Sequence, residues 1–229
     1  MIRRATLPLV LFASACLAAD PTPEEMLKAS LEKLTAAKAI HVKGAVAKIT
    51  AGDKKGATME EDLWVGEGNR VRADVTFVNG DERQSRLFVS DGTTQGMLEG
   101  VSDERGPATQ GLSAALIKAF LHGGSAIVGE MLDALDKCDA ATVTDVKAGG
   151  DAKVGDRDAV ILELAYTLNV HGDDVILTSK LFLDKATMLP LRRESKDQEG
   201  MEIEEVYASI EIDVAAPEGT FTLPLPKPK

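Results

Sequence analysis

A regular alternation in the last third of the chain constrains the fold more than any other feature. Every second residue from Val160 to Val170 is apolar, in the series Val160, Leu162, Leu164, Tyr166, Leu168 and Val170. Side chains of a strand point alternately to its two faces, so this period of two predicts a long strand with one buried face. A sheet made of such strands is most simply antiparallel, with one face packed and the other in water.

The same period appears in two blocks of the sequence, and turn signals separate the segments. Asn79-Gly80 is a strong hairpin signal, and Asp91-Gly92 and Gly172-Asp173 mark further turns. A change of parity near Glu204-Glu205 predicts a bulge. The expected strands are residues 40–46, 59–65, 71–77, 86–89, 93–98, 160–170, 175–183, 201–203 and 206–212. A further strand is expected to start near Pro190, with Arg192 and Arg193 at the beginning of its polar half.

Helical signals lie before the first block and between the two blocks. Thr22, Pro23 and Glu25 form a capping box with proline at the first helical position, which predicts a helix to about Ala39. Apolar residues at helical spacing predict two more helices, Gly111–Gly124 and Ala126–Cys138. Cys138 on such a stripe is most simply a buried thiol.

The order of these elements predicts an α+β fold in a single domain, residues 20–229. About nine to eleven antiparallel strands would curl rather than stay flat. The expected architecture is a strongly curved antiparallel β-sheet, a half-barrel, with the N-terminal helix and the helical insert covering its concave face. The alternation does not decide between a packed interior and an open cavity.

The first 19 residues have the layout of a secretory signal peptide: two arginines, an apolar run and then small residues. Two cleavage patterns remain open. Signal peptidase would cut among the alanines near residue 19, whereas Ala13-Ser14-Ala15-Cys16 resembles a lipobox that would make Cys16 the lipidated first residue. Either pattern predicts a periplasmic or other extracytoplasmic protein, anchored to a membrane if Cys16 is lipidated.

Charge and cysteine content restrict the partners further. Without Arg3 and Arg4 the 26 basic residues fall to 24 against 37 acidic ones, a net charge of −13. Such a surface repels nucleic acid and anionic headgroups. Only Cys138 remains beside Cys16, so no intramolecular disulfide is expected.

Four short motifs, taken in order, resemble the bacterial outer-membrane lipoprotein carrier superfamily (LolA/LolB-like). They are Gly68-Asn69-Arg70-Val71-Arg72, the strand Leu87–Ser90 entering Asp91-Gly92, the run from Leu181-Phe182-Leu183-Asp184 to Leu189-Pro190-Leu191-Arg192, and the closing Phe221-Thr222-Leu223-Pro224. The chain departs from that group at Gln95-Gly96, where an aromatic residue is common. The resemblance implies a carrier or acceptor that binds a lipid or an acylated lipoprotein, acts as a monomer and needs no cofactor.

The resemblance and the alternation together give a set of candidate site residues. The predicted cavity lining is Val42, Val46, Leu63, Val65, Val71, Val75, Phe77, Leu87, Val89, Leu162, Leu164, Tyr166, Leu181 and Leu183. The predicted lid is Leu112, Leu116, Phe120, Met131 and Leu135. Arg70 and Arg72 are the implied lid latch, although pairing with Asp74 on a solvated strand face is the simpler interpretation.

Other residues with chemical potential do not group into a site. His41, His122 and His171 are far apart in the sequence and are expected to be exposed. Trp64 either covers an edge of the sheet against the N-terminal helix or lines a cavity mouth. No nucleophile elbow, phosphate loop or metal-binding pattern appears, so an enzyme is not expected.

A second class of function is compatible with the same fold. An envelope stress sensor or another protein-binding module would have a filled cavity and a surface that recognises a partner, such as an envelope membrane protein.

Overall fold

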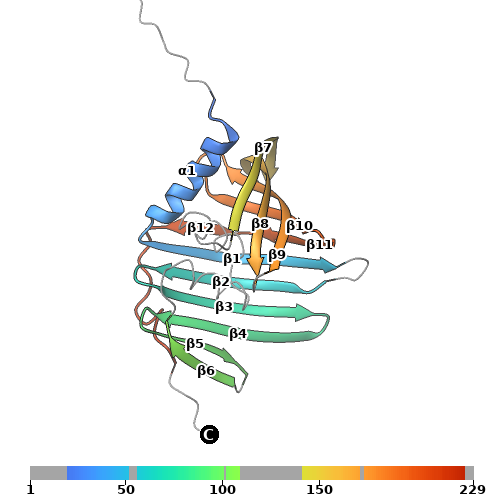
Figure 1. The fold of residues 1–229 in the computed structure, drawn as a ribbon. Coiled ribbons are helices and arrows are strands. Elements are labelled where there is room, and N and C mark those ends of the chain that lie inside the picture. The colour runs from blue at the N-terminus through green and yellow to red at the C-terminus, as the bar shows by residue number, and fades with distance from the viewer. Residues whose placement is uncertain (1–19, 52–55, 101, 109–140, 171–172, 225–229) are drawn as a thin grey trace, which may run out of the picture.

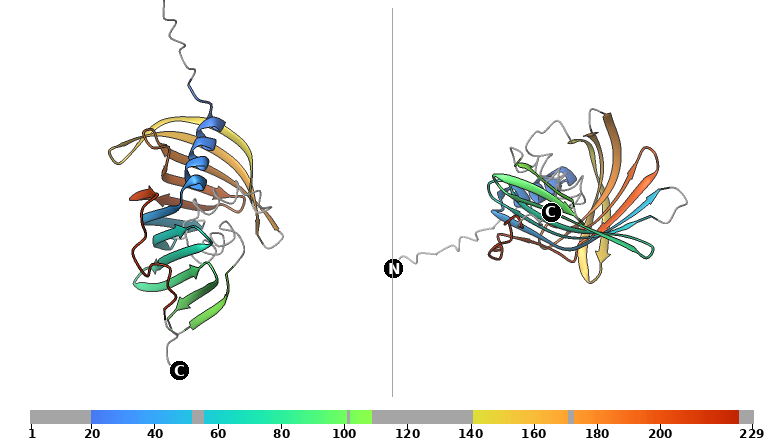
Figure 2. Two further views of the ribbon diagram at one scale, coloured as in Figure 1. Left: turned by 90° about the vertical axis from the view of Figure 1, so that its left-hand side faces the viewer. Right: turned by 90° about the horizontal axis from the view of Figure 1, so that it is seen from below.

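The computed structural model describes residues 20–51, 56–100, 102–108, 141–170 and 173–224, and these form one helix and one twelve-stranded sheet. The predicted α+β fold with a strongly curved antiparallel sheet is confirmed (Figures 1 and 2). The predicted helical insert and its lid residues Leu112, Leu116, Phe120, Met131 and Leu135 lie outside the described residues, as do Cys16, Cys138, His122 and His171.

The elements follow the chain in a simple order. They are α1 (Pro23–Ala36), β1 (Ala39–Ala51), β2 (Thr58–Gly66), β3 (Arg70–Asn79), β4 (Glu82–Asp91), β5 (Thr94–Glu99), β6 (Ser102–Pro107), β7 (Ala141–Val154), β8 (Arg157–Val170), β9 (Asp173–Asp184), β10 (Pro190–Asp197), β11 (Met201–Val206) and β12 (Ser209–Ile212).

The sheet is two meanders joined through its first strand. Its order is β6-β5-β4-β3-β2-β1-β11-β10-β9-β8-β7, and β12 pairs with the first half of β1. Since β1 pairs with β2 on one side and with β11 and β12 on the other, the C-terminal block closes onto the N-terminal block. The strands of β7–β9 run steeply across the direction of β1–β4, and the sheet curls around α1 (Figures 1 and 2).

The helix begins as its sequence predicts. Thr22 accepts a hydrogen bond from the Glu25 backbone N–H, the Glu25 carboxylate accepts one from the Thr22 backbone N–H, and Pro23 opens the first turn. Leu27 and Leu34, two buried residues of α1, belong to the main apolar cluster of the protein. That cluster lies between α1 and the inner face of the sheet.

Two bends in neighbouring segments set the curvature near the middle of the sheet. A bulge in β1 between Val42 and Ala45 is built on Gly44, which has a φ of +55°. Beside it the strand is interrupted between β11 and β12, where the Ala208 N–H donates to the Lys43 carbonyl. The sequence predicted a bulge at Glu204-Glu205; the break lies at Tyr207-Ala208, because β11 keeps an unbroken register with β1 from Met201 to Val206.

Strands β6 and β7 were not expected from the sequence. They form the two edges of the sheet, where one side of each strand has no neighbour among the described strands. Strand β6 is short and charged, and β7 contains two register shifts that interrupt its alternation. Both features are typical of protected sheet edges and both remove the period of two.

A glycine in the Asp91-Gly92 turn is required by its conformation and its surroundings. Gly92 has a φ of +93°, and a Cβ atom there would lie 2.2 Å from the carbonyl oxygen of Gly68. The turn is held by Asp91 Oδ1, which accepts from the N–H groups of Thr93 at 2.7 Å and Thr94 at 2.8 Å. These hydrogen bonds lower the pKa of the Asp91 carboxyl.

We therefore expect Gly92→Ala to lower the free energy of unfolding by about 2 kcal/mol, because it combines backbone strain with a backbone clash. Gly106→Ala is the matched control, since a Cβ at Gly106 meets nothing within 4 Å. Denaturant titration of both variants measures the difference. Equal stabilities of the two variants would contradict this account of the turn.

Candidate functional site

The inner face of the sheet is a continuous apolar surface that crosses most of the strands. Register pairs Val42 with Leu63, Leu63 with Ala73, and Ala73 with Phe88, so these side chains share one face. On the C-terminal side Leu162 pairs with Leu181. The same cluster includes Leu27 and Leu34 of α1, which identifies this face as the concave one (Figure 2).

Eleven of the predicted lining residues lie on the concave face. They are Val42, Leu63, Val65, Val71, Val75, Phe77, Leu162, Leu164, Tyr166, Leu181 and Leu183. Most are almost fully buried; Phe77 and Leu164 are partly exposed. A role for them in ligand binding remains a prediction.

The other three predicted lining residues, Val46, Leu87 and Val89, lie on the convex face. The bulge after Val42 moves Ala45 and Ala47 onto the concave face and turns Val46 outward. In β4 three apolar residues follow one another, so the alternation cannot select a face, and register places Phe88 inside opposite Ala73. Their placement on the concave face was therefore wrong.

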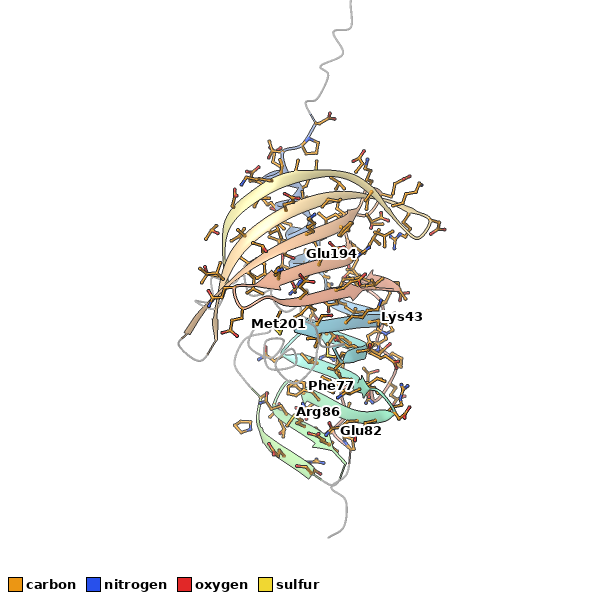
Figure 3. The ribbon with its side chains drawn as sticks, turned by 90° about the vertical axis from the view of Figure 1, so that its right-hand side faces the viewer. Lys43, Phe77, Glu82, Arg86, Glu194 and Met201 are labelled. Atoms are coloured by element: carbon orange, nitrogen blue, oxygen red, sulfur yellow. The ribbon has the colours of Figure 1, made fainter. Side chains whose placement is uncertain are left out.

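The β3–β4 end of the concave face has a charged cover that the sequence did not reveal. The Arg86 guanidinium lies 5.0 Å from the centre of the Phe77 ring and 3.0 Å from a carboxylate oxygen of Glu99. Phe77 and Arg86 lie next to each other in Figure 3. A cation over a ring face is attracted by the π electrons, so Arg86 shields the partly exposed aromatic residue at this rim.

Buried charges lie on the same face near the centre of the sheet. Glu61, Arg193 and Glu205 are 4%, 1% and 0% exposed. Arg193 was expected in the polar half of its strand, yet register places it opposite Leu181, facing inward. Arg193 has the same place in the alternation as Ser195 and Leu181, and this was the available sequence signal that its side chain faces inward. Two consecutive arginines are more simply interpreted as exposed.

The predicted latch residues lie on the convex face. Arg70 Nε donates to the Glu67 carbonyl at 2.8 Å, and its guanidinium lies 5.2 Å from the centre of the Phe221 ring. Arg72 donates to both carboxylate oxygens of Asp74, at 2.6 Å and 3.0 Å. From these positions neither guanidinium faces the apolar side of its own strand.

The C-terminal segment that follows β12 packs over the same convex region. The Phe221 ring lies 3.1 Å from the position of a Cβ on Gly66, and Leu223 would clash with a Cβ on Gly96 at 2.7 Å. Arg105 donates to the Pro224 carbonyl at 2.6 Å. Gly96, where the resembled family commonly has an aromatic residue nearby, thus makes room for Leu223.

His41 and Trp64 form a stacked pair on the convex face, which corrects two expectations. His41 was expected to be exposed but is 6% exposed, with its ring 3.7 Å from that of Trp64 and its Nε2 3.1 Å from Asp62 Oδ1. Trp64 faces away from α1, because it alternates with the inward-facing Leu63 and Val65. It therefore neither covers the sheet against the helix nor lines the concave face.

Neither of two hollows lined by described residues coincides with the predicted cavity. One of about 680 Å³ lies mainly on the convex side of β1 and β7–β11 and is lined by alternating charges, including Lys48, Arg192 and Glu204. Of the predicted lining residues it touches Leu164. The other, of about 820 Å³, separates the C-terminal segment from the ends of β1 and β2 and includes Arg70.

Within the described ranges, no three His, Cys, Asp or Glu side chains gather closely enough to hold a metal ion. In that same part of the chain, no helix has the length and apolar character needed to cross a membrane.

Comparison with known proteins supports the fold. The chain is similar to LprF from Mycobacterium bovis, with a TM-score of 0.51 and 14% identity over 86% of this chain and 99% of LprF. MucB matches with a TM-score of 0.48 and 20% identity over 89% of this chain, which spans only 63% of the length of MucB. The LolA superfamily protein NE2245 from Nitrosomonas europaea matches with a TM-score of 0.41 and 14% identity, over 89% and 99% of the two chains.

No family model and no curated protein matches the sequence. At these identities the likeness concerns the fold alone. The fold that the four-motif resemblance implies is confirmed: the chain has a strongly curved antiparallel sheet, like LprF.

Proposed function

We propose that this protein is an extracytoplasmic carrier or acceptor that binds a lipid or a lipoprotein acyl chain on its concave face, without catalysis. The observation that carries the proposal is the continuous apolar surface that register brings together from the two halves of the sheet. Cys16 is its membrane anchor if it is lipidated. The signal-peptide layout of the first 19 residues supports an extracytoplasmic location.

Binding of an acyl chain requires a large apolar contact surface. Moving a chain out of water contributes about 0.8 kcal/mol per methylene, so a chain of about sixteen carbons requires on the order of ten kcal/mol of apolar contact. A few polar groups cannot provide this. A wide face of valine, leucine and phenylalanine side chains can.

The two sides of β3 and β4 offer a sharp test of which face binds. Phe77 is inward and Leu87 outward, and both are partly exposed, so an aspartate at either position tests one face at a time. We expect Phe77→Asp to weaken binding of a fluorescent fatty acid to the delipidated mature protein at least tenfold, because the ligand would have to desolvate a carboxylate. Leu87→Asp should change the affinity less than twofold.

Circular dichroism of both variants establishes that they are folded. Equal losses of affinity in the two variants, or no probe binding to the wild-type protein, would overturn the proposal. In the second case a protein-binding module on the same fold becomes the better account, and its test is capture of an envelope membrane protein by the wild-type chain.

A further inference from the structure

The concave face is not equally accessible over its whole area. In the cluster that it forms with α1, Val42, Leu63 and Leu162 are all 0% exposed. A side chain in this state already contacts protein atoms on every side, so a ligand finds no apolar surface there to remove from water. Hydrocarbon has a place to bind only where inward apolar residues remain partly exposed.

One register row of the concave face keeps such residues. It crosses six adjacent strands, β7, β8, β9, β10, β11 and β1. We name it the accessible row, and its members in that order are Val146, Leu164, Ser179, Ser195, Ile203 and Ile49. All four apolar members are partly exposed.

The accessible row is long enough for one extended acyl chain. Neighbouring strands lie about 4.8 Å apart, so five spacings make a row about 24 Å long along the sheet. The hydrocarbon core of a bilayer is about 30 Å thick and holds two acyl chains end to end, so one chain needs about half of that length. Phe77 of β3, also partly exposed, extends the apolar surface beyond the Ile49 end of the row.

The two serines in the middle of the row do not oppose the binding of hydrocarbon. The Ser179 hydroxyl donates to the Glu194 carbonyl at 3.1 Å. Ser195 Oγ accepts from Arg193 Nε at 3.2 Å and from Arg193 Nη2 at 2.8 Å. Because both hydroxyls already have hydrogen bonds within the protein, an acyl chain that covers them does not deprive them of a partner.

Buried residues border the row on both sides across β8 and β9. On one side Leu162 lies opposite Leu181, and both are 0% exposed. On the other side Tyr166 lies opposite Leu177, and these residues are 5% and 7% exposed. The accessible strip is therefore one residue wide in this part of the sheet, which gives room for one acyl chain at a time.

From this arrangement we propose that the ligand binds through a single acyl chain that lies across the strands along the accessible row, while the part of the concave face packed with α1 is a closed core. This inference rests on the proposed function and specifies its ligand class, an amphiphile that inserts one chain. Leu164 and Ile203 are then residues that contact the hydrocarbon.

Quenching of tryptophan fluorescence by a brominated acyl chain tests this placement, because bromine quenches tryptophans that lie close to it. The wild-type chain has one tryptophan, Trp64, on the convex face. The variant Trp64→Phe/Ile203→Trp moves this reporter into the accessible row. The variant Trp64→Phe/Phe88→Trp moves it to the concave face outside the row, where Phe88 is 4% exposed opposite Ala73.

Stearic acid with two bromines in mid-chain is the probe, and unbrominated stearic acid is the matched control ligand. At saturation we expect bromine to lower the fluorescence of the Ile203→Trp variant by at least half. The fluorescence of the Phe88→Trp variant and of the wild-type protein should fall by less than a tenth. Calorimetric titration of the delipidated wild-type protein should give one stearic acid per chain.

A second reporter in the row protects the test against a variant that does not fold. Trp64→Phe/Leu164→Trp should be quenched as strongly as the Ile203→Trp variant, and circular dichroism establishes which variants are folded. No quenching in the folded row variants, although the wild-type protein binds stearic acid, would overturn the placement.

The remaining outcomes separate the two proposals. Equal quenching of the Ile203→Trp and Phe88→Trp variants would overturn the placement along the row and leave the lipid carrier standing. Two stearic acids bound per chain would overturn the single-chain inference alone. Strong quenching of Trp64 in the wild-type protein, or no binding of stearic acid to it, would overturn both proposals.

Discussion

Replacing Leu181 with alanine should lower the free energy of unfolding by about 3 kcal/mol, because it leaves a cavity in a site that cannot collapse. Leu181 is 0% exposed. Register places it between Leu162 of β8 and Arg193 of β10, two residues whose side chains are themselves almost fully buried. The backbone ladders on both sides hold these neighbours apart, so the surroundings have little freedom to fill the space.

The control for this variant lies on the same strand. Ile176 is 55% exposed, and its replacement with alanine should change the stability by less than about 0.5 kcal/mol. Chemical denaturation at neutral pH measures both values. A loss at Leu181 no greater than that at Ile176 would mean that β9 does not bury its inner face as described.

Replacing Asp184 with alanine should lower the stability by about 3 kcal/mol at pH 7, because several hydrogen bonds to one buried carboxylate are lost together. Asp184 Oδ1 accepts from the N–H groups of Ala186 at 2.8 Å and Thr187 at 2.7 Å and from the Thr187 hydroxyl at 3.1 Å. Its Oδ2 accepts from Arg157 Nε at 2.6 Å. The carboxylate thus organises the turn between β9 and β10.

The same residue makes a prediction about pH. Burial by itself would raise the pKa of Asp184, but the hydrogen bonds from Thr187, the charge of Arg157 and the hydrogen bond from Ala186 together outweigh it and lower the pKa. A carboxyl whose pKa is lower in the folded than in the unfolded state stabilises the protein above the unfolded value, which is about 4. This stabilisation is lost as the pH falls through the lower, folded pKa.

The difference in stability between wild-type protein and Asp184→Ala should therefore be largest near pH 7 and shrink below about pH 4. Asp158→Ala, which removes an exposed carboxylate paired with Lys153 at 2.9 Å, is the control and should have little effect at any pH. Urea titrations at several pH values measure the differences. A gap between wild type and Asp184→Ala that stays constant down to pH 2.5 would contradict the stated cause.

The sequence predicted the fold because the period of two is a local signal. In β8 the inward residues from Val160 to Tyr166 are apolar and the register with β9 has no shift, so the alternation and the buried face coincide. The capping box of α1 was predictable for the same reason, since all its groups lie within three residues of one another.

The incorrect predictions arise where the inward face of a strand is determined by another segment of the chain. The side of β1 that faces inward changes at the bulge near Gly44, and the reason lies more than 150 residues away at Ala208. In β4 the run Leu87-Phe88-Val89 is apolar on both faces, since the C-terminal segment covers the convex side near Gly96. No local pattern in either strand contains this information.

The buried charges of the concave face could not be predicted from the sequence for a related reason. Arg193 and Glu205 look like ordinary members of charged strands until register sets them opposite each other on the buried face. Charged residues are rarely buried, so a single sequence favours the exposed interpretation. Their shared position on the buried face is visible only after β10, β11 and β1 have been aligned.

Native mass spectrometry of the purified mature protein, released gently from its aqueous buffer, tests most directly whether the concave face holds a hydrocarbon tail. The account predicts a population heavier than the polypeptide by the mass of one lipid, which tandem dissociation releases as a molecule with at least one acyl chain. A bare polypeptide mass in every charge state, unchanged after incubation with a long-chain fatty acid, would contradict it.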